Sequence, residues 1–392
     1  MRAVLARVRV GVLRSAAAIV CAAAVTSLSA QPADVAIVAR GMIDVERGRL
    51  IDNAVVLVRG SRIVAAGARG DVAIPEGASR IELPSAILLP GLIDAHVHLT
   101  LAGAPAANAR ATLAAGFTTV QDLGAAGYAN VAVRDAIAKG RIEGPRVVAA
   151  GPWLGVSGGT CDFNGIGVRG VDAFRARVRE DVEHGADLIK VCVSGWLADA
   201  VASPAKYEIS DDELRAAIDE AHARGKRVAV HALSEAGIAA AVRSGADVIA
   251  HGGFASAETV RVMKQRGIAQ LPTLFSLSSA PPDQFAALRA HMRQAVAAGL
   301  PVAFGTDAGV IPHGDNAREF DELAAIGLDP AAALRAATVS AAAAVGMPRE
   351  IGVLAPGRLA DIVGVAANPL QDLKTLQRMT FVMKDGKPVK LN

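Results

Sequence analysis

The sequence predicts an α/β protein, a (β/α)8 TIM barrel with a small β-sandwich domain built from both ends of the chain. Through the middle of the chain, apolar strand-like runs alternate with Ala-rich amphipathic helices, which is the pattern of parallel βα units. Eight such runs occur, the number of strands in a (β/α)8 barrel. Short strand-like runs broken by glycine lie before and after this region.

The length and composition are consistent with this architecture. The 392 residues suffice for a barrel and a satellite domain. Because 52% of the residues are hydrophobic and only 20% are charged, the chain can bury a large core. We predict four segments: a signal peptide in residues 1–30, the first part of the small β domain in 31–85, the (β/α)8 barrel in 86–346 and the second part of the small domain in 347–392.

The N-terminus has the order of a secretory signal peptide. Its first part contains four arginines and no acid: Arg2, Arg7, Arg9 and Arg14. An apolar run follows over Ala16–Val25, and the small residues of Thr26–Ala30 precede Gln31. A membrane anchor is the alternative, although this run is too short to span a bilayer comfortably. A lipid anchor at Cys21 is a lesser option, because Val20 before it matches a lipoprotein cleavage site poorly. We therefore expect an exported protein, periplasmic or secreted.

Charge excludes one class of partner. The whole chain has 41 Lys and Arg against 38 Asp and Glu, and the predicted signal removes four arginines. The mature chain would be near neutral, so nothing favours binding to nucleic acid. No later segment is long and apolar enough for a transmembrane helix, and no stable membrane insertion is expected. A small-molecule substrate is the expected partner, and a homo-oligomer is possible.

The predicted elements can be placed by their patterns. Short strands are expected at both ends of the chain, in Ala36–Val38, Ala54–Val58, Ile63–Ala66, Ile362–Val365 and Phe381–Lys384, the last followed by the turn Asp385–Gly386. The eight central strands are Ala86–Asp94, Thr118–Asp122, Arg146–Ala150, Leu188–Val193, Val228–His231, Val248–His251, Ile268–Pro272 and Val302–Thr306. Helices are expected at Val171–His184, Asp211–Arg224, Ser234–Ser244 and Thr259–Arg266. Ser210 with Glu213 has capping-box spacing, and Asp329 before Pro330 marks another helix start. An open doubly wound sheet is the alternative fold, but no G-x-G-x-x-G fingerprint follows a strand.

Histidines gather at the ends of the predicted strands. Four of the eight lie there: His96, His98, His231 and His251. The carboxyl ends of parallel barrel strands meet at one mouth, where the active sites of such barrels lie. The pair His96-Val97-His98 places both imidazoles on one side of a strand, as two nitrogen ligands of one metal require. His184, His222 and His291 fall within helices, where packing or solvent contact is the expected role.

Two further polar residues complete a candidate metal site. Asp307 follows the eighth predicted strand and adds a carboxylate to the histidines. Lys190 interrupts the apolar strand Leu188–Val193. Because a lone buried ammonium is costly, we expect this lysine to be paired, neutralised or modified. A simple ion pair with an acid in the barrel is the alternative.

The ordered set of motifs resembles the amidohydrolase superfamily. Leu89–His98 (LPGLIDAHVH) is similar to the first-strand signature of that family, and Gly305-Thr306-Asp307 to its eighth-strand aspartate. Lys190 occupies the place of the carboxylated bridging lysine, and His231 and His251 those of the fifth- and sixth-strand histidines. The loop from His313 to Glu319 resembles the imidazolonepropionase-like branch, which includes Xaa-Pro and Xaa-Arg dipeptidases and ochratoxin-type amidohydrolases.

This resemblance implies a binuclear hydrolase. His96, His98 and Asp307 would hold one divalent ion, His231 and His251 the other, and Lys190, as N6-carboxylysine, would bridge them. The ions, most simply zinc, would activate a bridging hydroxide for attack on an amide C–N bond in a dipeptide or N-acyl amino acid type of substrate. Asp307 would be the catalytic base. A lactone or phosphotriester hydrolase would use the same site, and a non-catalytic binding protein on the same fold is the alternative of another class.

Residues on the loops above the site are the candidates for contacting substrate. Tyr207, His313 and Asn316 are predicted to bind it, and ordinary loop packing is the alternative for each. Trp153 and Trp196 follow strand ends and could form walls of the pocket or pack in the core. Cys161 and Cys192 could pair after export, but two cysteines are no disulfide framework, so their state remains open at this point.

Export leads to a direct prediction. Because positive, apolar and small-residue segments follow one another in order, we expect cleavage near Ala30 in the native host. N-terminal sequencing of the protein recovered from that host would check this. An intact Met1 on protein from the cytoplasmic fraction would contradict it.

Overall fold

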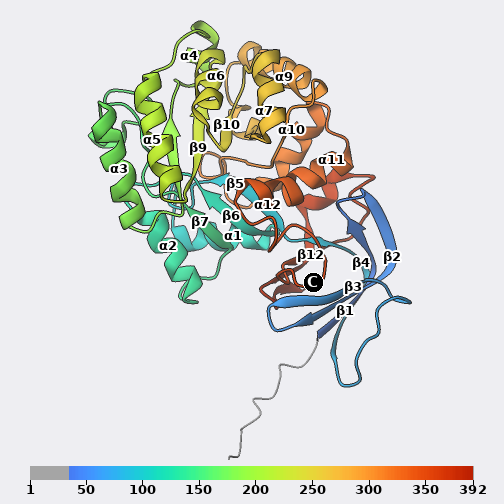
Figure 1. The fold of residues 1–392 in the computed structure, drawn as a ribbon. Coiled ribbons are helices and arrows are strands. Elements are labelled where there is room, and N and C mark those ends of the chain that lie inside the picture. The colour runs from blue at the N-terminus through green and yellow to red at the C-terminus, as the bar shows by residue number, and fades with distance from the viewer. Residues whose placement is uncertain (1–34, 392) are drawn as a thin grey trace, which may run out of the picture. The chain divides into compact units, whose positions relative to one another are not determined.

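The computed structural model describes residues 35–391 and shows two connected parts, a barrel and a smaller sheet (Figure 1). The predicted signal segment, residues 1–30, lies outside the described residues. None of the helices in the described range is both long and apolar enough to cross a membrane.

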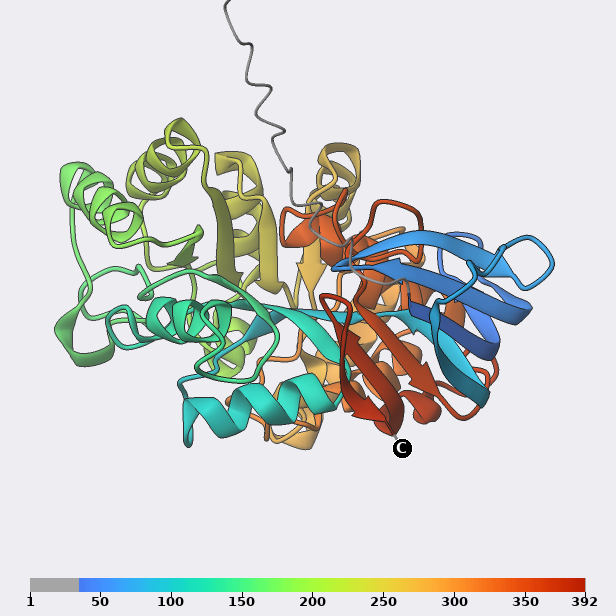
Figure 2. The ribbon, with the colours of Figure 1, turned by 90° about the horizontal axis from the view of Figure 1, so that it is seen from below.

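Both ends of the described chain contribute to one seven-stranded sheet, with the order β14-β13-β12-β4-β1-β2-β3. Its strands are β1 (Val35–Asp44), β2 (Arg49–Arg59), β3 (Arg62–Ala68), β4 (Ser79–Pro90), β12 (Ile362–Val365), β13 (Met379–Lys384) and β14 (Lys387–Leu391). Strand β12 pairs antiparallel with β4, which brings the N- and C-terminal strands side by side, as Figure 2 shows. A shared apolar core that includes Ile37, Val56 and Phe381 holds them together. The small β domain built from both termini is thus confirmed.

The barrel strands run parallel in two groups. The first group is β5 (Leu92–Val97), β6 (Phe117–Asp122) and β7 (Arg146–Ala149), and the second is β8 (Leu188–Cys192), β9 (Arg227–Ala232), β10 (Val248–His251) and β11 (Ala269–Leu271). Backbone hydrogen bonds join the groups at both junctions. Leu154 donates to Lys190 and accepts from Cys192 between β7 and β8. Ala303 donates to Gln270 of β11, and Phe304 accepts from Ala95 of β5. The predicted (β/α)8 barrel is therefore confirmed.

The eighth strand differs from the prediction. Val302–Thr306 makes ladder-type bonds to both neighbours but forms no regular strand. Its backbone turns into the left-handed region at Asp307, where φ is 62°, so the pairing cannot continue as an extended ladder.

The helices lie outside the barrel strands in Figure 1. They are α1 (Pro105–Ala114), α2 (Ala129–Ala138), α3 (Val171–Glu183), α4 (Leu197–Ala202), α5 (Asp211–Ala223), α6 (Glu235–Ser244), α7 (Ala257–Arg266), α8 (Leu274–Leu277), α9 (Pro282–Ala297), α10 (Glu319–Ala325), α11 (Pro330–Arg335) and α12 (Ala341–Ala344). The capping box at Ser210 and Glu213 forms as predicted. The carboxylate of Asp329 likewise accepts from the backbone N–H of Ala332 and begins α11.

One glycine separates the two parts of the fold. The prediction of a single strand over Ala86–Asp94 is wrong, because β4 ends at Pro90 and β5 begins at Leu92. A Cβ on the intervening Gly91 would overlap the side chain of Thr118 on β6. The sequence pattern hid this break because the last five residues of β4 and the first two of β5 are all apolar and buried.

A disulfide joins Cys161 to Cys192, with their Cα atoms 6.0 Å apart. Cys192 is the last residue of β8, and Cys161 lies on the loop between β7 and α3. The sequence alone did not decide whether these two cysteines form a disulfide. In the structure, the bond ties a loop at the barrel mouth to the strand that carries Lys190.

We expect the double variant Cys161→Ala, Cys192→Ala to be less stable than the parent. Removing a crosslink of sequence separation 31 restores chain entropy to the unfolded state worth about 3–4 kcal/mol. The thermal midpoint should fall by roughly 5 °C, measured by calorimetry without reductant. The parent treated with a phosphine reductant should match the variant, which itself should not respond. Equal midpoints for oxidised parent and variant would contradict the assignment.

Candidate metal centre

The structure brings all six predicted ligands to one cavity of 80 Å³ at the carboxyl ends of the strands. They are His96 in β5, His98 directly after it, Lys190 in β8, His231 in β9, His251 at the end of β10, and Asp307 after the eighth segment. Each of these side chains belongs to a buried residue. The period-two geometry of each strand points these residues inward while their neighbours pack outward.

Short distances connect the ligands. The Oδ1 atom of Asp307 lies 3.4 Å from Nε2 of His96 and 3.1 Å from Nε2 of His98. Ligand atoms of His96, His251 and Asp307 all lie within 4.8 Å of one another. The ring centroids of His231 and His251 are 4.6 Å apart. These residues could hold a metal ion.

Contacts at Nδ1, on the side of the ring away from the cavity, orient two of the histidines. His98 donates from Nδ1 to the carbonyl oxygen of Gly124 over 2.9 Å. His251 Nδ1 lies 2.7 Å from the hydroxyl oxygen of Thr273. These contacts leave Nε2 of both rings available at the cavity. Such outer contacts fix the ring orientation and tautomer of metal-binding histidines.

Two buried nitrogen atoms of the candidate ligands have no hydrogen-bond partner among the described residues: Nδ1 of His96 and Nζ of Lys190. A buried polar atom without a partner is costly, so an ion or a covalent modification would relieve it. Burial lowers the pKa of Lys190 to about 7, which makes a large share of its amine neutral near neutral pH. The neutral amine is the form that combines with carbon dioxide.

Three of the other ionisable groups, His96, His231 and Asp307, have the protonation states that a metal needs, whereas Asp307 raises the pKa of His98 against the effect of burial. Burial, assisted by the charge of Lys190, lowers the pKa of His231 to about 4. The same two causes hold the pKa of His96 well below its usual value. Burial would raise the pKa of Asp307, but His96 and His98 hold it well below the usual carboxyl range. Neutral imidazoles and an ionised carboxylate are the metal-binding forms, so these residues fit a metal centre.

A buried carboxylate beneath the ligands, Asp94, was not predicted from the sequence. Its Oδ1 accepts from the backbone N–H of His96 and of Thr306, each over 3.1 Å. Its Oδ2 accepts from the Thr306 hydroxyl over 2.6 Å and from the Asn316 amide over 2.8 Å. Asp94 thus links the strand of His96 to the segment of Asp307. The signal available was an acid inside the apolar run Leu92–Val97.

The three predicted substrate contacts do not line this cavity. Asn316 is completely buried and bonds Asp94, so it positions a carboxylate instead of facing the mouth. His313 lies against His98, with Nε2 3.2 Å from that residue's carbonyl oxygen. Tyr207 donates to Asp211 over 2.8 Å beside a neighbouring cavity. A role for these residues in binding substrate stays a prediction.

Both tryptophans do line the cavity, as one reading of the sequence suggested. The indole of Trp153 lies 5.6 Å from the His98 ring, and that of Trp196 lies 5.3 Å from the His231 ring, centroid to centroid. Gly124, with φ of 146°, makes room for Trp153, because a Cβ there would overlap the indole.

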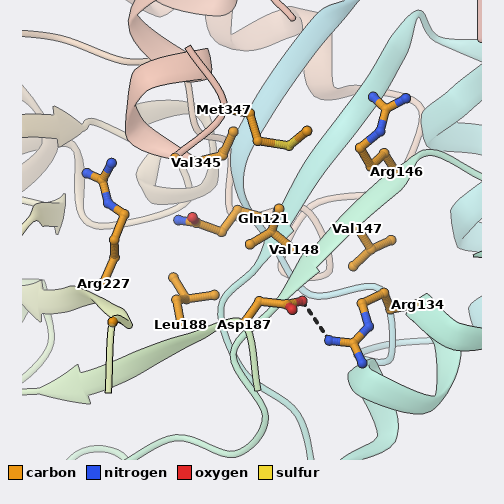
Figure 3. A pocket seen from close by; sticks show the side chains of 12 residues that line it. Gln121, Arg134, Arg146, Val147, Val148, Asp187, Leu188, Arg227, Val345 and Met347 are labelled. Atoms are coloured by element: carbon orange, nitrogen blue, oxygen red, sulfur yellow. Dashed lines mark hydrogen bonds and ion pairs between the residues drawn. The ribbon is translucent and has the colours of Figure 1, made fainter. Parts of the chain in front are cut away.

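A larger cavity of 350 Å³ lies at the amino ends of β7, β8 and β9 (Figure 3). Its charges are already paired. Arg134 contacts Asp187 over 2.7 Å, the dashed line of Figure 3, and Arg146 contacts Asp361 over 2.6 Å. Because the active sites of such barrels lie at the opposite, carboxyl end, size does not make this cavity the functional site.

Comparisons with known proteins show the family to which the chain belongs. The sequence profile of the amidohydrolase family matches residues 87–389. Ochratoxinase of Aspergillus niger is 29% identical over 426 aligned residues, covering 92% of this chain and 87% of that one. Imidazolonepropionase of Ralstonia nicotianae is 29% identical, covering 88% and 94%. A crystal structure of a Xaa-Pro dipeptidase with bound methionine superposes with a TM-score of 0.84 at 28% identity, covering 91% of this chain and 100% of that one. The chain therefore belongs to the amidohydrolase family, which confirms the resemblance drawn from its motifs.

Proposed function

We propose that the protein is a binuclear metal-dependent hydrolase that cleaves an amide C–N bond of the kind found in dipeptides and N-acyl amino acids. The main support for this proposal is that four histidines and one aspartate line a single cavity. The same cavity contains the buried amine of Lys190, which has no hydrogen-bond partner in the described part of the chain. The similar proteins include a Xaa-Pro dipeptidase and ochratoxinase, which supports hydrolysis of amides over other bonds.

The ligand set divides between two ions. His96, His98 and Asp307 would hold one, and His231 and His251 would hold the other. Lys190 would contribute a carbamate: its neutral nitrogen would add to the carbon of CO2 and release one proton, so that a neutral amine becomes an anion. Zinc suits this mixture of imidazole and carboxylate ligands.

The residues of the chain then have distinct roles in the reaction. When bound, the two ions would supply Lewis acidity, which lowers the pKa of water and polarises a carbonyl group. Asp307, ionised at working pH, would take the proton of the attacking water and pass it to the departing nitrogen. Trp153 and Trp196 would limit the access of bulk water beside the ligands.

Replacing Lys190 tests the binuclear site. We expect the parent to bind about two divalent ions per chain and to lose activity with them on chelation. Lys190→Ala should bind fewer ions and lose at least about 100-fold in kcat/KM, because the bridging anion is gone. Elemental analysis measures the bound ions, and turnover of a panel of dipeptides, N-acyl amino acids and uncharged acetamides measures the activity. Added short carboxylic acids should restore part of the activity by replacing the carbamate.

The matched control for this experiment is Lys139→Ala, which removes an exposed lysine at the end of α2 and should behave as the parent. If Lys190→Ala keeps its full metal content and activity, Lys190 does not bridge two ions, and the site is then assigned as mononuclear. If the parent contains no divalent metal, the proposed function fails.

Replacing Asp307 separates proton transfer from metal binding. Asp307→Asn should retain much of its metal through the remaining ligands yet lose about 100-fold or more in kcat, because an amide accepts no proton at neutral pH. Asp315→Asn changes an exposed aspartate on the same loop and should leave kcat as it is. An Asp307→Asn protein with parental kcat would show that another group is the base.

A further inference from the structure

Exposed apolar side chains concentrate around the mouth of the metal cavity. Six large apolar residues of the described chain are exposed, and four of them line this cavity: Leu101 (40%), Phe163 (39%), Trp196 (50%) and Val310 (58%). We call these four residues together with Trp153 the apolar rim. Water contact at so many large side chains in one place indicates a binding surface.

The apolar rim is assembled from separate loops. Leu101 follows β5, Trp153 and Phe163 follow β7, Trp196 follows β8, and Val310 follows the eighth segment. The rings of Trp153 and Phe163 pack edge to face at 4.9 Å, and the disulfide at Cys161 holds this loop to β8. A role in core packing does not explain the side chains of the apolar rim, because most of them are exposed to solvent around a common opening.

The apolar rim adjoins the reacting position. Trp153 lies against His98 and Trp196 against His231, so aromatic surface flanks the ligands on two sides. The cavity itself, at 80 Å³, is small compared with pockets that enclose a whole ligand. With the scissile bond at the ligands, the substituent of the substrate would lie on the rim.

The cavity offers no cation for a free carboxylate. Among the described residues that line it, the basic groups are Lys190 and the four histidines, all of them candidate ligands. The nearby Lys206 lines the neighbouring cavity together with Asp199 and Glu208. A substrate carboxylate on the rim would therefore lose water without gaining an ionic partner from the chain, which is unfavourable.

We infer that the preferred substrate is an uncharged amide with an aromatic or bulky aliphatic group next to the scissile bond, and that the apolar rim recognises this group. The inference rests on the proposed amide hydrolysis and revises one part of it: it favours uncharged amides over the free-acid dipeptides and N-acyl amino acids. Burial of the substrate's aromatic ring on the apolar rim contributes affinity. Because the described residues of the cavity offer no cation to pair with a carboxylate, acidic substrates bind less well.

Three matched acetamides test the inference on the metal-loaded enzyme. N-acetylphenethylamine has a ring and no charge, N-ethylacetamide lacks the ring, and N-acetyl-L-phenylalanine adds a carboxylate to the first. We expect kcat/KM for N-acetylphenethylamine to exceed that for each of the others about tenfold or more. Equal values for the first two, or a preference for N-acetyl-L-phenylalanine, would overturn the inference while leaving amide hydrolysis intact.

A binding measurement keeps the inference testable if none of these amides is hydrolysed. The chain has 2 tryptophans, and both belong to the apolar rim, so intrinsic fluorescence reports occupancy there. Titration of the metal-loaded parent should show N-acetylphenethylamine binding about tenfold more tightly than N-acetyl-L-phenylalanine. Failure of turnover alone would count against the proposed function, whereas loss of this binding preference would count against the rim.

Variants assign the preference to named residues. Trp196→Ala and Phe163→Ala should each reduce the preference for the phenethyl over the ethyl amide several-fold. Leu391→Ala, which removes an even more exposed apolar side chain from β14, should keep the parental preference. If Trp196→Ala leaves the preference unchanged but abolishes flotation with phosphatidylcholine vesicles or a dimer seen by sedimentation, the rim is a lipid or protein surface and the inference is wrong.

Discussion

The centre of this structure depends on one amine held inside the barrel. Along β8, Ile189 and Val191 pack outward among the helices, so the alternation of the strand points Lys190 inward. The floor beneath it is apolar, built from residues such as Ile93, Leu188 and Leu271. An isolated ammonium is strongly disfavoured there, and the same burial holds the imidazoles of His96 and His231 neutral. The charge of Asp307 offsets this burial only in part, so the pKa of Lys190 stays below its ordinary value.

The backbone around the site also carries strain. His251 and Asp307 have φ values of 67° and 62°, and Thr273, which contacts His251, has 50°. Such left-handed positions in residues other than glycine cost about 1–3 kcal/mol each. Hydrogen bonds compensate, since Asp307 donates its N–H to the carbonyl of His96 over 2.7 Å. At His251 and Asp307 the turn ends the extended segment, and both side chains line the cavity.

Much of this organisation could be predicted because its signals are local. The alternation of apolar strands and amphipathic helices can be recognised along the chain. It places His231 and His251 near strand ends and a lysine inside an apolar strand. Other features depend on tertiary contacts. The break at Gly91 arises from the approach of Thr118, and the buried position of Asn316 arises from Asp94, 222 residues away. Neither partner can be identified from spacing along the sequence. The disulfide likewise needed the distance between Cys161 and Cys192.

The pairing of β4 has a consequence for the order in which the protein can be assembled. One edge of β4 pairs with β1, which is synthesised earlier, but the other edge pairs with β12, which begins at Ile362. Until the last part of the chain has been made, that edge has unpaired backbone groups next to the apolar residues Ile87, Leu88 and Leu89. Exposed edges of this kind associate readily with other chains. The small sheet can therefore close only after synthesis of the barrel, and a growing chain benefits from being kept unfolded or covered until its C-terminus arrives.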